Sequence, residues 1–276
     1  MKSAIALLKE RGLRPKKRFG QNFLLDQGIC ARIAEASSTP AGGTTLEIGP
    51  GLGALTRPLL ERAARVVAIE RDPELAAVLR EEFAAELATG HLTLLEGDAL
   101  EQNWLSAFDA GPRPHIVAGN LPYLITGRLL EKSIAIASQI DRAVFMVQAE
   151  VADRIVSRPG TEDYGGLSVF VQAAFEPKKL LTVKGGAFHP RPEVDSTVIV
   201  LTPLVPARAV EDEPFRALVK GAFGARRKTL RNAWKGLFGW SPSELAAHAA
   251  AVNIDLDRRG ETLSVDEFGL LAARAR

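Results

Sequence analysis

The sequence predicts an α/β fold in which helices cover both faces of a mostly parallel sheet, followed by a small all-α domain. Strand and helix signals alternate as far as about residue 200, which is the pattern of parallel strands joined by crossover helices. A glycine-rich turn at residues 49–53 links the first of these strands to its helix. Beyond residue 206 only helical patterns remain. We therefore expect a first domain at residues 1–205 and a second at 206–276.

The elements of the first domain alternate in chain order. They are a strand at 44–48, a helix at 54–62, a strand at 65–69, a helix at 72–87, strands at 91–95 and 115–118, a helix at 125–137 and a strand at 143–147. Apolar, β-branched runs such as RVVAI at 65–69 indicate strands that are buried on both faces. Asp72 and Pro73 are favoured at the start of a helix, as N-cap and first helical residue.

The alternation of strands and helices changes after about residue 178. Strand patterns at 179–183 and 197–201 are separated only by the Gly- and Pro-rich loop 184–196, which predicts a late antiparallel hairpin at one edge of the sheet. Residues 202–206 resemble a linker. The helices expected after the linker are 214–223, 227–237, 243–251 and 265–274.

Cysteine and histidine usage excludes several kinds of site. Cys30 is the sole cysteine, so no disulfide can form within the chain, and we expect a buried structural thiol in a reducing, intracellular compartment. The four histidines are scattered and match no zinc spacing, so we expect no metal. The N-terminal residues lack the apolar run of a signal peptide, and no apolar run reaches the length of a membrane span. We expect a cytoplasmic protein.

Positive charge gathers at the two ends of the chain. Residues 1–20 hold seven Lys or Arg against one acid, and residues 206–276 hold twelve against nine, although the net charge of the chain is only +2. Such ends fit a nucleic-acid-binding face, and they equally fit an ordinary solvated surface.

The turn Glu47-Ile48-Gly49-Pro50-Gly51-Leu52-Gly53 follows a strand and opens a helix. Gly49 and Gly51 let the backbone approach a ligand closely at the carboxyl edge of the sheet. Glu70 ends the next strand, where an acid can accept hydrogen bonds from ribose hydroxyls. Asp98, just past the third strand, is placed to bond an adenine amino group, to cap the short segment after it, or both. The pattern predicts a site for an adenosyl or nucleotide ligand.

A nicotinamide-dependent dehydrogenase is the competing interpretation of this turn, because Gly49, Gly51 and Ala54 also fit the looser dinucleotide fingerprint. Glu47 speaks against it, since its negative charge would lie beside a pyrophosphate. A cationic sulfonium ligand tolerates such an acid.

The loop Asn120-Leu121-Pro122-Tyr123 follows the fourth strand and predicts the chemistry. The exocyclic amino group of a base is a poor nucleophile, because its lone pair is delocalised into the ring. A side-chain amide oxygen and a backbone carbonyl can accept its two hydrogen bonds and aim the lone pair at a methyl carbon. Pro122 stiffens the loop, and Tyr123 offers a ring on which an unstacked base can lie. Taken alone, the same four residues also suit an ordinary turn.

With these motifs in order, the chain resembles the adenine dimethyltransferases of small-subunit ribosomal RNA, a family of Rossmann-like class I methyltransferases that use S-adenosyl-L-methionine. The resemblance covers nearly the whole chain. Two further segments carry it: Arg18-Phe19-Gly20-Gln21-Asn22-Phe23-Leu24 before the first strand, and the FxPxPxVxS loop that runs from Phe188 to Ser196. The run Arg226-Arg227-Lys228-Thr229-Leu230-Arg231-Asn232 is similar to the family's basic helix at the start of the C-terminal domain.

The resemblance implies a role for each matched residue. The residues that it implies for cofactor binding are Asn22, Leu24, Gly49, Gly51, Glu70, Asp98 and Asn120. The residues that it implies for catalysis are Asn120, Leu121, Pro122, Tyr123 and Phe188, with the ring of Phe188 packed on the target base. The cations expected to contact RNA are Arg14, Lys16, Lys17, Arg18, Arg226, Arg227, Lys228 and Arg231.

The resemblance also implies a substrate and a partner. The substrate would be two adjacent adenines in a hairpin loop near the 3′ end of small-subunit (16S) ribosomal RNA, each dimethylated on the exocyclic amino group. The partner would be this RNA within an immature ribosomal subunit, bound by a monomer with no membrane contact. An RNA-binding assembly or transcription factor on the same scaffold and a DNA adenine methyltransferase remain open as alternatives at this point.

Overall fold

The computed structural model describes residues 4–38, 40–225 and 227–276. Contacts between residues group the chain into two compact units: the first runs to Ala152 and resumes at Lys178–Pro203, and the second comprises Asp153–Pro177 and Leu204–Arg276. The sequence placed residues 153–177 in the first domain instead. They group with the C-terminal helices because Tyr164, Val169 and Ala173 are buried in the same apolar cluster as Phe215 and Phe268. The division into domains at 205/206 otherwise stays a prediction.

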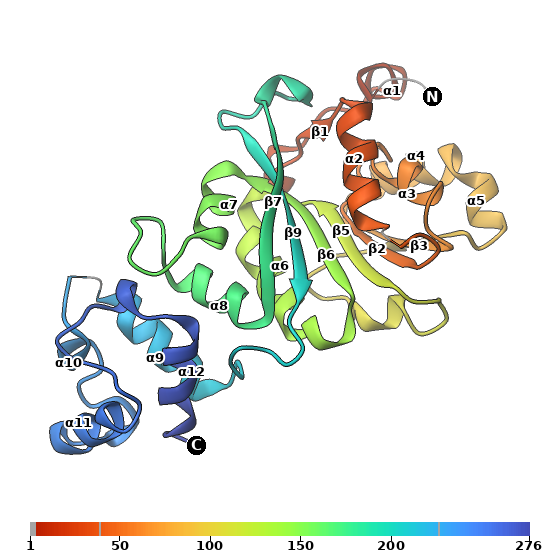
Figure 1. Ribbon diagram of the computed structural model, residues 1–276. Coiled ribbons are helices and arrows are strands. Elements are labelled where there is room, and N and C mark those ends of the chain that lie inside the picture. The colour runs from red at the N-terminus through yellow and green to blue at the C-terminus, as the bar shows by residue number, and fades with distance from the viewer. Residues whose placement is uncertain (1–3, 39, 226) are drawn as a thin grey trace. The chain divides into compact units, whose positions relative to one another are not determined.

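Seven strands of the described residues form one sheet, in the order β4-β3-β2-β5-β6-β9-β7 (Figure 1). Their bounds are β2 Thr44–Ile48, β3 Arg65–Glu70, β4 Leu92–Glu96, β5 His115–Asn120, β6 Arg142–Gln148, β7 Phe175–Val183 and β9 Ser196–Pro203. The pairs among β2, β3, β4, β5 and β6 are parallel, and β9 runs antiparallel to β6. The α/β fold with a mostly parallel sheet and late antiparallel pairing is confirmed.

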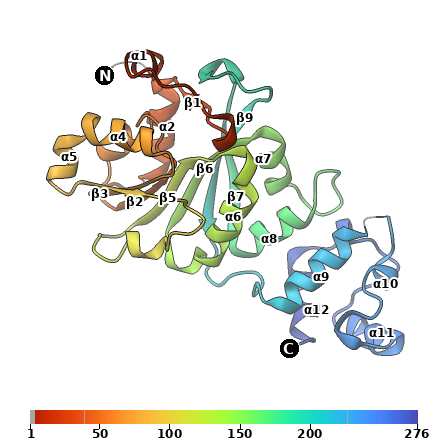
Figure 2. The ribbon, with the colours of Figure 1, turned by 180° about the vertical axis from the view of Figure 1, so that it is seen from behind.

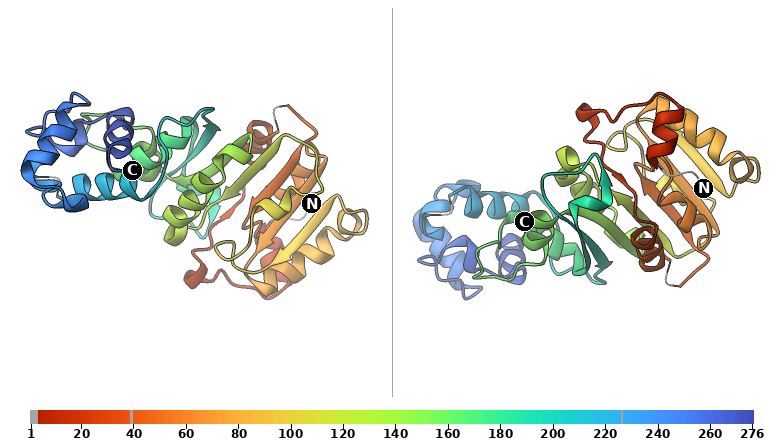
Figure 3. Two further views of the ribbon diagram at one scale, coloured as in Figure 1. Left: turned by 90° about the horizontal axis from the view of Figure 1, so that it is seen from below. Right: turned by 90° about the horizontal axis from the view of Figure 1, so that it is seen from above.

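Helices of the first unit cover both faces of this sheet. They are α1 Ala4–Glu10, α2 Gln27–Ser37, α3 Thr56–Leu60, α4 Pro73–Glu82, α5 Ala84–Ala88, α6 Thr126–Ala135 and α7 Ala149–Val156, the last of which crosses into the second unit. α2 lies over one face (Figure 1) and α6 over the other (Figure 2), and Figure 3 shows the same layers from below and from above. The helix expected at 72–87 is divided at Phe83, where the backbone leaves the helical region.

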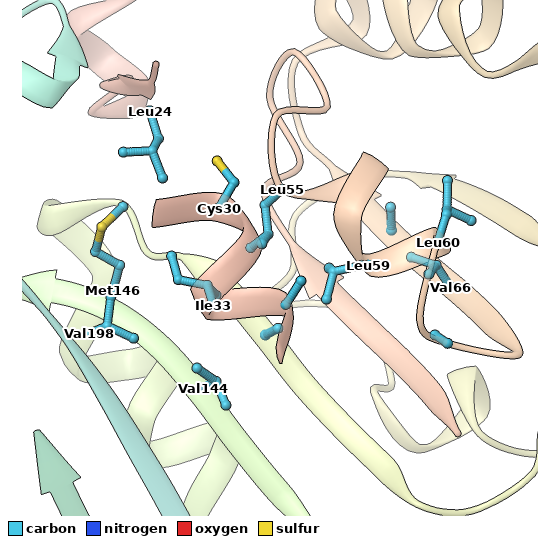
Figure 4. Close-up of a cluster of buried hydrophobic side chains, with 14 of the residues drawn as sticks. Leu24, Cys30, Ile33, Leu55, Leu59, Leu60, Val66, Val144, Met146 and Val198 are labelled. Carbon is cyan, nitrogen blue, oxygen red and sulfur yellow. The ribbon is translucent and has the colours of Figure 1, made fainter. Parts of the chain in front are cut away.

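The core beneath α2 follows from the alternation of side chains along the strands. Val144 and Met146 of β6 point toward Ile33 and Cys30 of α2 (Figure 4). Their neighbours Ala143, Phe145 and Val147 must face the other way and are also fully buried, so this strand has no solvated face. Cys30 is 0% exposed, as expected for a structural thiol, and burial raises the pKa of its thiol to about 12.

The second unit is helical apart from the first residues of β7. Its helices are α8 Gly166–Ala174, α9 Glu213–Gly224, α10 Leu230–Ala233, α11 Pro242–Ala250 and α12 Val265–Ala273. Ser241 and Ser264 open α11 and α12 with reciprocal capping hydrogen bonds. Trp234 is buried between helices, and its indole N–H donates to the Leu218 carbonyl at 2.9 Å.

The prediction of a long basic helix at 227–237 is wrong. Thr229 has the extended backbone of an N-cap (φ −67, ψ 158), and the helix that follows is only four residues long. Gly236 then adopts φ 74 and prevents its continuation. Arg227 and Lys228 therefore precede α10 and do not share a helical face with Arg231.

Across the described ranges, no helix combines the length and apolar character needed to span a membrane.

Gly119→Ala is expected to destabilise the sheet beside the site. A Cβ at Gly119 would lie 2.5 Å from the Ile48 carbonyl oxygen in β2, so β5 would have to move, at a cost of about 1–3 kcal/mol. Gly127→Ala is the matched control, because a Cβ there meets nothing within 4 Å. Urea denaturation should show a lower midpoint for Gly119→Ala alone; equal midpoints for the two variants would refute this account of the packing.

Candidate functional site

A cavity lies at the carboxyl edge of the sheet, within the first unit. It is bounded by the glycine turn after β2, the ends of β3 and β4, the loop after β5, and residues 18–24. β2 is flanked by β3 and β5, so the chain leaves β2 in one direction and returns on its other side, the position where doubly wound sheets bind ligands. The empty space is about 1260 Å³ with open solvent at the mouth included.

The glycine turn brings main-chain atoms to the cavity wall. Gly49 and Gly51 adopt φ 68 and φ 61, a region that disfavours residues with a side chain. A Cβ at Gly51 would also lie 3.3 Å from the ring of Phe23. Both features explain why glycine stands at these positions, and the close approach of a ligand stays a prediction.

Glu70 ends β3 with its carboxylate held from two sides. Oε2 accepts from the Gly51 N–H at 3.0 Å, and Oε1 accepts from the Asp72 N–H at 2.8 Å. The side chain is nearly buried, and burial raises its pKa, although these hydrogen bonds oppose the shift. Each carboxylate oxygen has a second lone pair, so a fixed Glu70 can still accept hydrogen bonds from a ligand.

Asp98 also lines the cavity. Its Oδ1 accepts from the Leu100 N–H at 2.9 Å, and its Oδ2 pairs with Arg71 at 3.1 Å. The turn-capping role that the sequence left open is therefore present. It leaves the second lone pairs of the carboxylate available to a ligand.

Asn120 stands at the end of β5 with its carboxamide fixed by the N-terminal segment. Its Nδ2 donates to the Asn22 carbonyl at 2.9 Å, which leaves Oδ1 as the acceptor on this side chain. Asn22 and Leu24 line the same cavity, and the Asn22 amide is itself held by the Gly20 carbonyl.

The loop after Asn120 is stiffened by hydrogen bonds. The Pro122 carbonyl accepts from the Ile125 N–H and from the Thr126 hydroxyl, at 3.1 and 3.0 Å. The Tyr123 hydroxyl bonds Ser196 Oγ at 2.8 Å, and burial raises the pKa of this phenol. Because the Pro122 carbonyl is already used, the Leu121 carbonyl is the neighbouring main-chain acceptor left for a ligand.

The packing of Phe188 on the target base stays a prediction. Phe188 is 3% exposed, belongs to the apolar cluster that contains Leu24 and Ile33, and is absent from the cavity wall. The cause is a short ladder between β1 (Phe23–Leu24) and β8 (Phe188–His189), in which Leu24 pairs with Phe188.

The structure separates the predicted RNA-contacting cations into different classes. Arg14, Arg18, Arg227 and Lys228 are exposed, whereas Arg231 pairs with Asp257 at 3.2 Å. The Lys16 ammonium is turned toward acids, 2.7 Å from Asp72 and 2.9 Å from Glu74. Arg226 and the side chain of Lys17 lie outside the described residues.

Sequence reasoning missed two features of the cavity rim. The ring of Phe19 lies beneath the guanidinium groups of Arg18 and Arg71, at 4.7 and 5.4 Å. Leu124, in the loop after Tyr123, is 74% exposed. An apolar residue directly after the NLPY loop was the available signal for the second feature.

Glu47 is buried behind the glycine turn and accepts from the Thr56 hydroxyl at 2.7 Å. Burial raises its pKa to about 8, and the nearby Glu70 carboxylate adds to the shift. Glu47 is therefore mostly protonated at neutral pH. A protonated Glu47 would not repel a pyrophosphate, so this residue no longer argues against a dinucleotide-binding turn.

Among the residues that the structure describes, no three His, Cys, Asp or Glu side chains gather as metal ligands.

Comparison with known proteins identifies relatives over nearly the full length. The model of a family described as ribosomal RNA adenine dimethylase matches residues 12–270. The chain is 44% identical to ribosomal RNA small subunit methyltransferase A of Moorella thermoacetica, over 97% of this chain and 95% of that protein. It is also 44% identical to the protein of the same name from Geobacter metallireducens, over 96% and 97% of the two chains.

Two solved structures are similar. The 23S rRNA methyltransferase ErmE is 26% identical with a TM-score of 0.67, over 91% of this chain and 98% of that one. A dimethyladenosine transferase from Plasmodium falciparum has a TM-score of 0.78 over 90% of this chain and 95% of that one. At 24% identity, this second likeness supports the fold alone.

Glu47→Gln should change how stability depends on pH. Between the ordinary carboxyl pKa of 4.5 and about 8, the folded parent keeps a proton that the unfolded chain releases, so the parent loses stability as pH rises through this window. The glutamine keeps the Thr56 hydrogen bond and does not titrate. Urea denaturation of the ligand-free proteins should show the variant gaining stability relative to the parent as pH rises. A pH-independent difference would contradict the raised pKa.

Proposed function

Because the chain belongs to the ribosomal RNA adenine dimethylase family, we propose that it dimethylates the exocyclic amino groups of two adjacent adenines in a 3′-terminal hairpin loop of small-subunit (16S) ribosomal RNA. It is an S-adenosyl-L-methionine-dependent rRNA (adenine-N6,N6)-dimethyltransferase of ribosome assembly. The observation that supports this chemistry best is the neutral Asn120 carboxamide, fixed at the same cavity that Gly51 and Glu70 line.

The residues of the cavity fit the methyl donor. Glu70 has lone pairs left for ribose hydroxyls, and the turn at Gly49 and Gly51 allows a ligand to approach the main chain. We assign the adenine amino group to Asp98 and the methionine end to Asn22 and Leu24, all of which line the cavity. When bound, S-adenosyl-L-methionine supplies an electrophilic methyl group.

The chain's own part in the reaction is to bind and orient the target base. Asn120 Oδ1 and the Leu121 carbonyl accept the two hydrogen bonds of the adenine amino group, which draws the nitrogen away from conjugation with the ring. The Tyr123 ring supports the extruded base. No ionised side chain has to act as a base, because the amino proton becomes acidic once the methyl has been transferred.

RNA binding relies on exposed cations. We propose Arg14, Arg18, Arg227, Lys228 and Arg231 as phosphate contacts, since each is exposed and phosphate contacts position an RNA without reading its sequence. The proposed partner is ribosomal RNA within an immature small subunit, bound by a cytoplasmic monomer.

Purified protein, S-adenosyl-L-methionine and small subunits that lack the modification should yield dimethyladenosine in the 16S rRNA, as detected by mass spectrometry. Asn120→Ala should lower the methylation rate by about 10²–10³-fold, the usual cost of losing one polar contact to the reacting group, while calorimetry shows that cofactor still binds. A parent that binds cofactor but transfers no methyl would favour a non-catalytic assembly factor. Wild-type rates in Asn120→Ala would sink the mechanism.

Tyr123→Ala and Tyr123→Phe separate the ring from the hydroxyl. Loss of the ring removes a stacking contact worth about 1–3 kcal/mol, so kcat/KM for the ribosomal substrate should fall about tenfold or more in Tyr123→Ala. Tyr123→Phe loses only the bond to Ser196 and should stay close to the parent. Equal losses in the two variants would assign the role to the hydroxyl.

A further inference from the structure

The Asp72 carboxylate receives more hydrogen bonds than a helix cap requires. Asp72 is 1% exposed at the start of α4. Its Oδ1 accepts from the Glu74 N–H at 3.1 Å, which is the capping bond. The same oxygen lies 2.7 Å from Lys16 Nζ, and Oδ2 accepts from Gln21 Nε2 at 2.9 Å.

These bonds fasten the segment that forms one wall of the cavity. The Gln21 side chain also accepts from the Lys16 N–H at 2.8 Å, so residues 16–21 form a closed turn with both ends tied to Asp72. Residues 18–24, which begin within this turn, line the cavity. Within them, the Asn22 carbonyl receives the Asn120 Nδ2, so the position of the segment sets the orientation of the catalytic carboxamide.

The main chain of Asp72 serves the opposite wall. Its N–H donates to Glu70 Oε1 at 2.8 Å, while Glu70 Oε2 holds the Gly51 N–H. One residue therefore connects the wall formed by residues 18–24 with the acid that faces the ribose.

The charges of this contact are shielded from water. The side chains of Lys16 and Asp72 are 22% and 2% exposed. Burial alone would raise the pKa of Asp72, but the hydrogen bonds from Lys16 and Gln21 outweigh it and hold the pKa below its usual range. The bond to Asp72 raises the pKa of Lys16. Both groups remain ionised at neutral pH.

We propose that Asp72 is a positioning residue whose carboxylate holds residues 16–24 against the cavity, so that the cofactor site and the Asn120 carboxamide are assembled before RNA arrives. Lys16 then serves this tether rather than an RNA phosphate. The proposal rests on the proposed function for the identity of the ligand, S-adenosyl-L-methionine.

Calorimetric titration of S-adenosyl-L-methionine into the full chain without RNA tests the proposal. Asp72→Asn keeps the size and the capping oxygen but removes the charge, and Lys16→Met removes the charged partner while keeping a side chain of similar length. Each should raise the cofactor Kd about tenfold, the scale of a hydrogen bond to a charged group. The double variant should bind no worse than the weaker single variant, and Lys16→Arg should restore binding.

Asp212→Asn is the matched control. Asp212 caps α9 by accepting from the Phe215 N–H at 3.0 Å and pairs with Arg276 at 2.5 Å, so it loses the same kinds of contact in the second unit. Its cofactor Kd should equal that of the parent. The proposal is wrong if Asp72→Asn lowers the stability of the fold but leaves the cofactor Kd unchanged. It is also wrong if Lys16→Met raises the KM for RNA but leaves the cofactor Kd unchanged. If the Asp72 variants weaken cofactor binding as expected but the parent methylates no rRNA, the proposed function is overturned instead.

Discussion

The in-register parallel pairing of β2 with β3 and β5 is the constraint from which the site follows. Ile48 lies opposite Ile69, and Glu47 lies opposite both Ala68 and Ala118. Because these strands end at one edge, the glycine turn, Glu70 and Asn120 reach the same cavity without further adjustment. The absence of a Cβ at Gly119 lets β5 lie close to the Ile48 carbonyl, so the catalytic loop begins against the glycine turn.

The second constraint is that acids gather at this edge with little water to solvate them. Glu47 avoids a buried charge by keeping its proton, since its pKa is about 8, and it accepts a hydrogen bond from the Thr56 hydroxyl. Glu70 meets the constraint with main-chain donors, and Asp72 with an ammonium and an amide. The three nearby carboxyl groups are therefore stabilised in three different ways: by a bound proton, by main-chain N–H donors, and by an ion pair with a side-chain amide.

Local sequence patterns predicted most of the strands and the position of the cavity. Runs of β-branched residues located β2 and β3, and the order of Gly51, Glu70 and Asn120 along successive strand ends located the cavity. What the sequence could not show depends on contacts between distant segments. The burial of Phe188 requires its pairing with Leu24, and the placement of residues 153–177 reflects contacts such as the Tyr164 hydroxyl bond to the Leu263 carbonyl at 2.9 Å. The hydrophobic periodicity of the sequence does not indicate either contact.

Charge clusters were the least reliable signal, because pairing decides what a cation can bind. The ion pair between Arg231 and Asp257 is exposed on both sides, with 52% and 71% of the side chains accessible. Such pairs contribute about 0–1 kcal/mol, so an RNA phosphate can displace the aspartate at little cost. Lys16 sits between two acids, one of them nearly buried, and moving it to a phosphate would leave the Asp72 charge desolvated and unpaired. Two cations that look equivalent in the sequence therefore lie in different surroundings: Arg231 is exposed in a weak ion pair, and Lys16 is held against a nearly buried carboxylate.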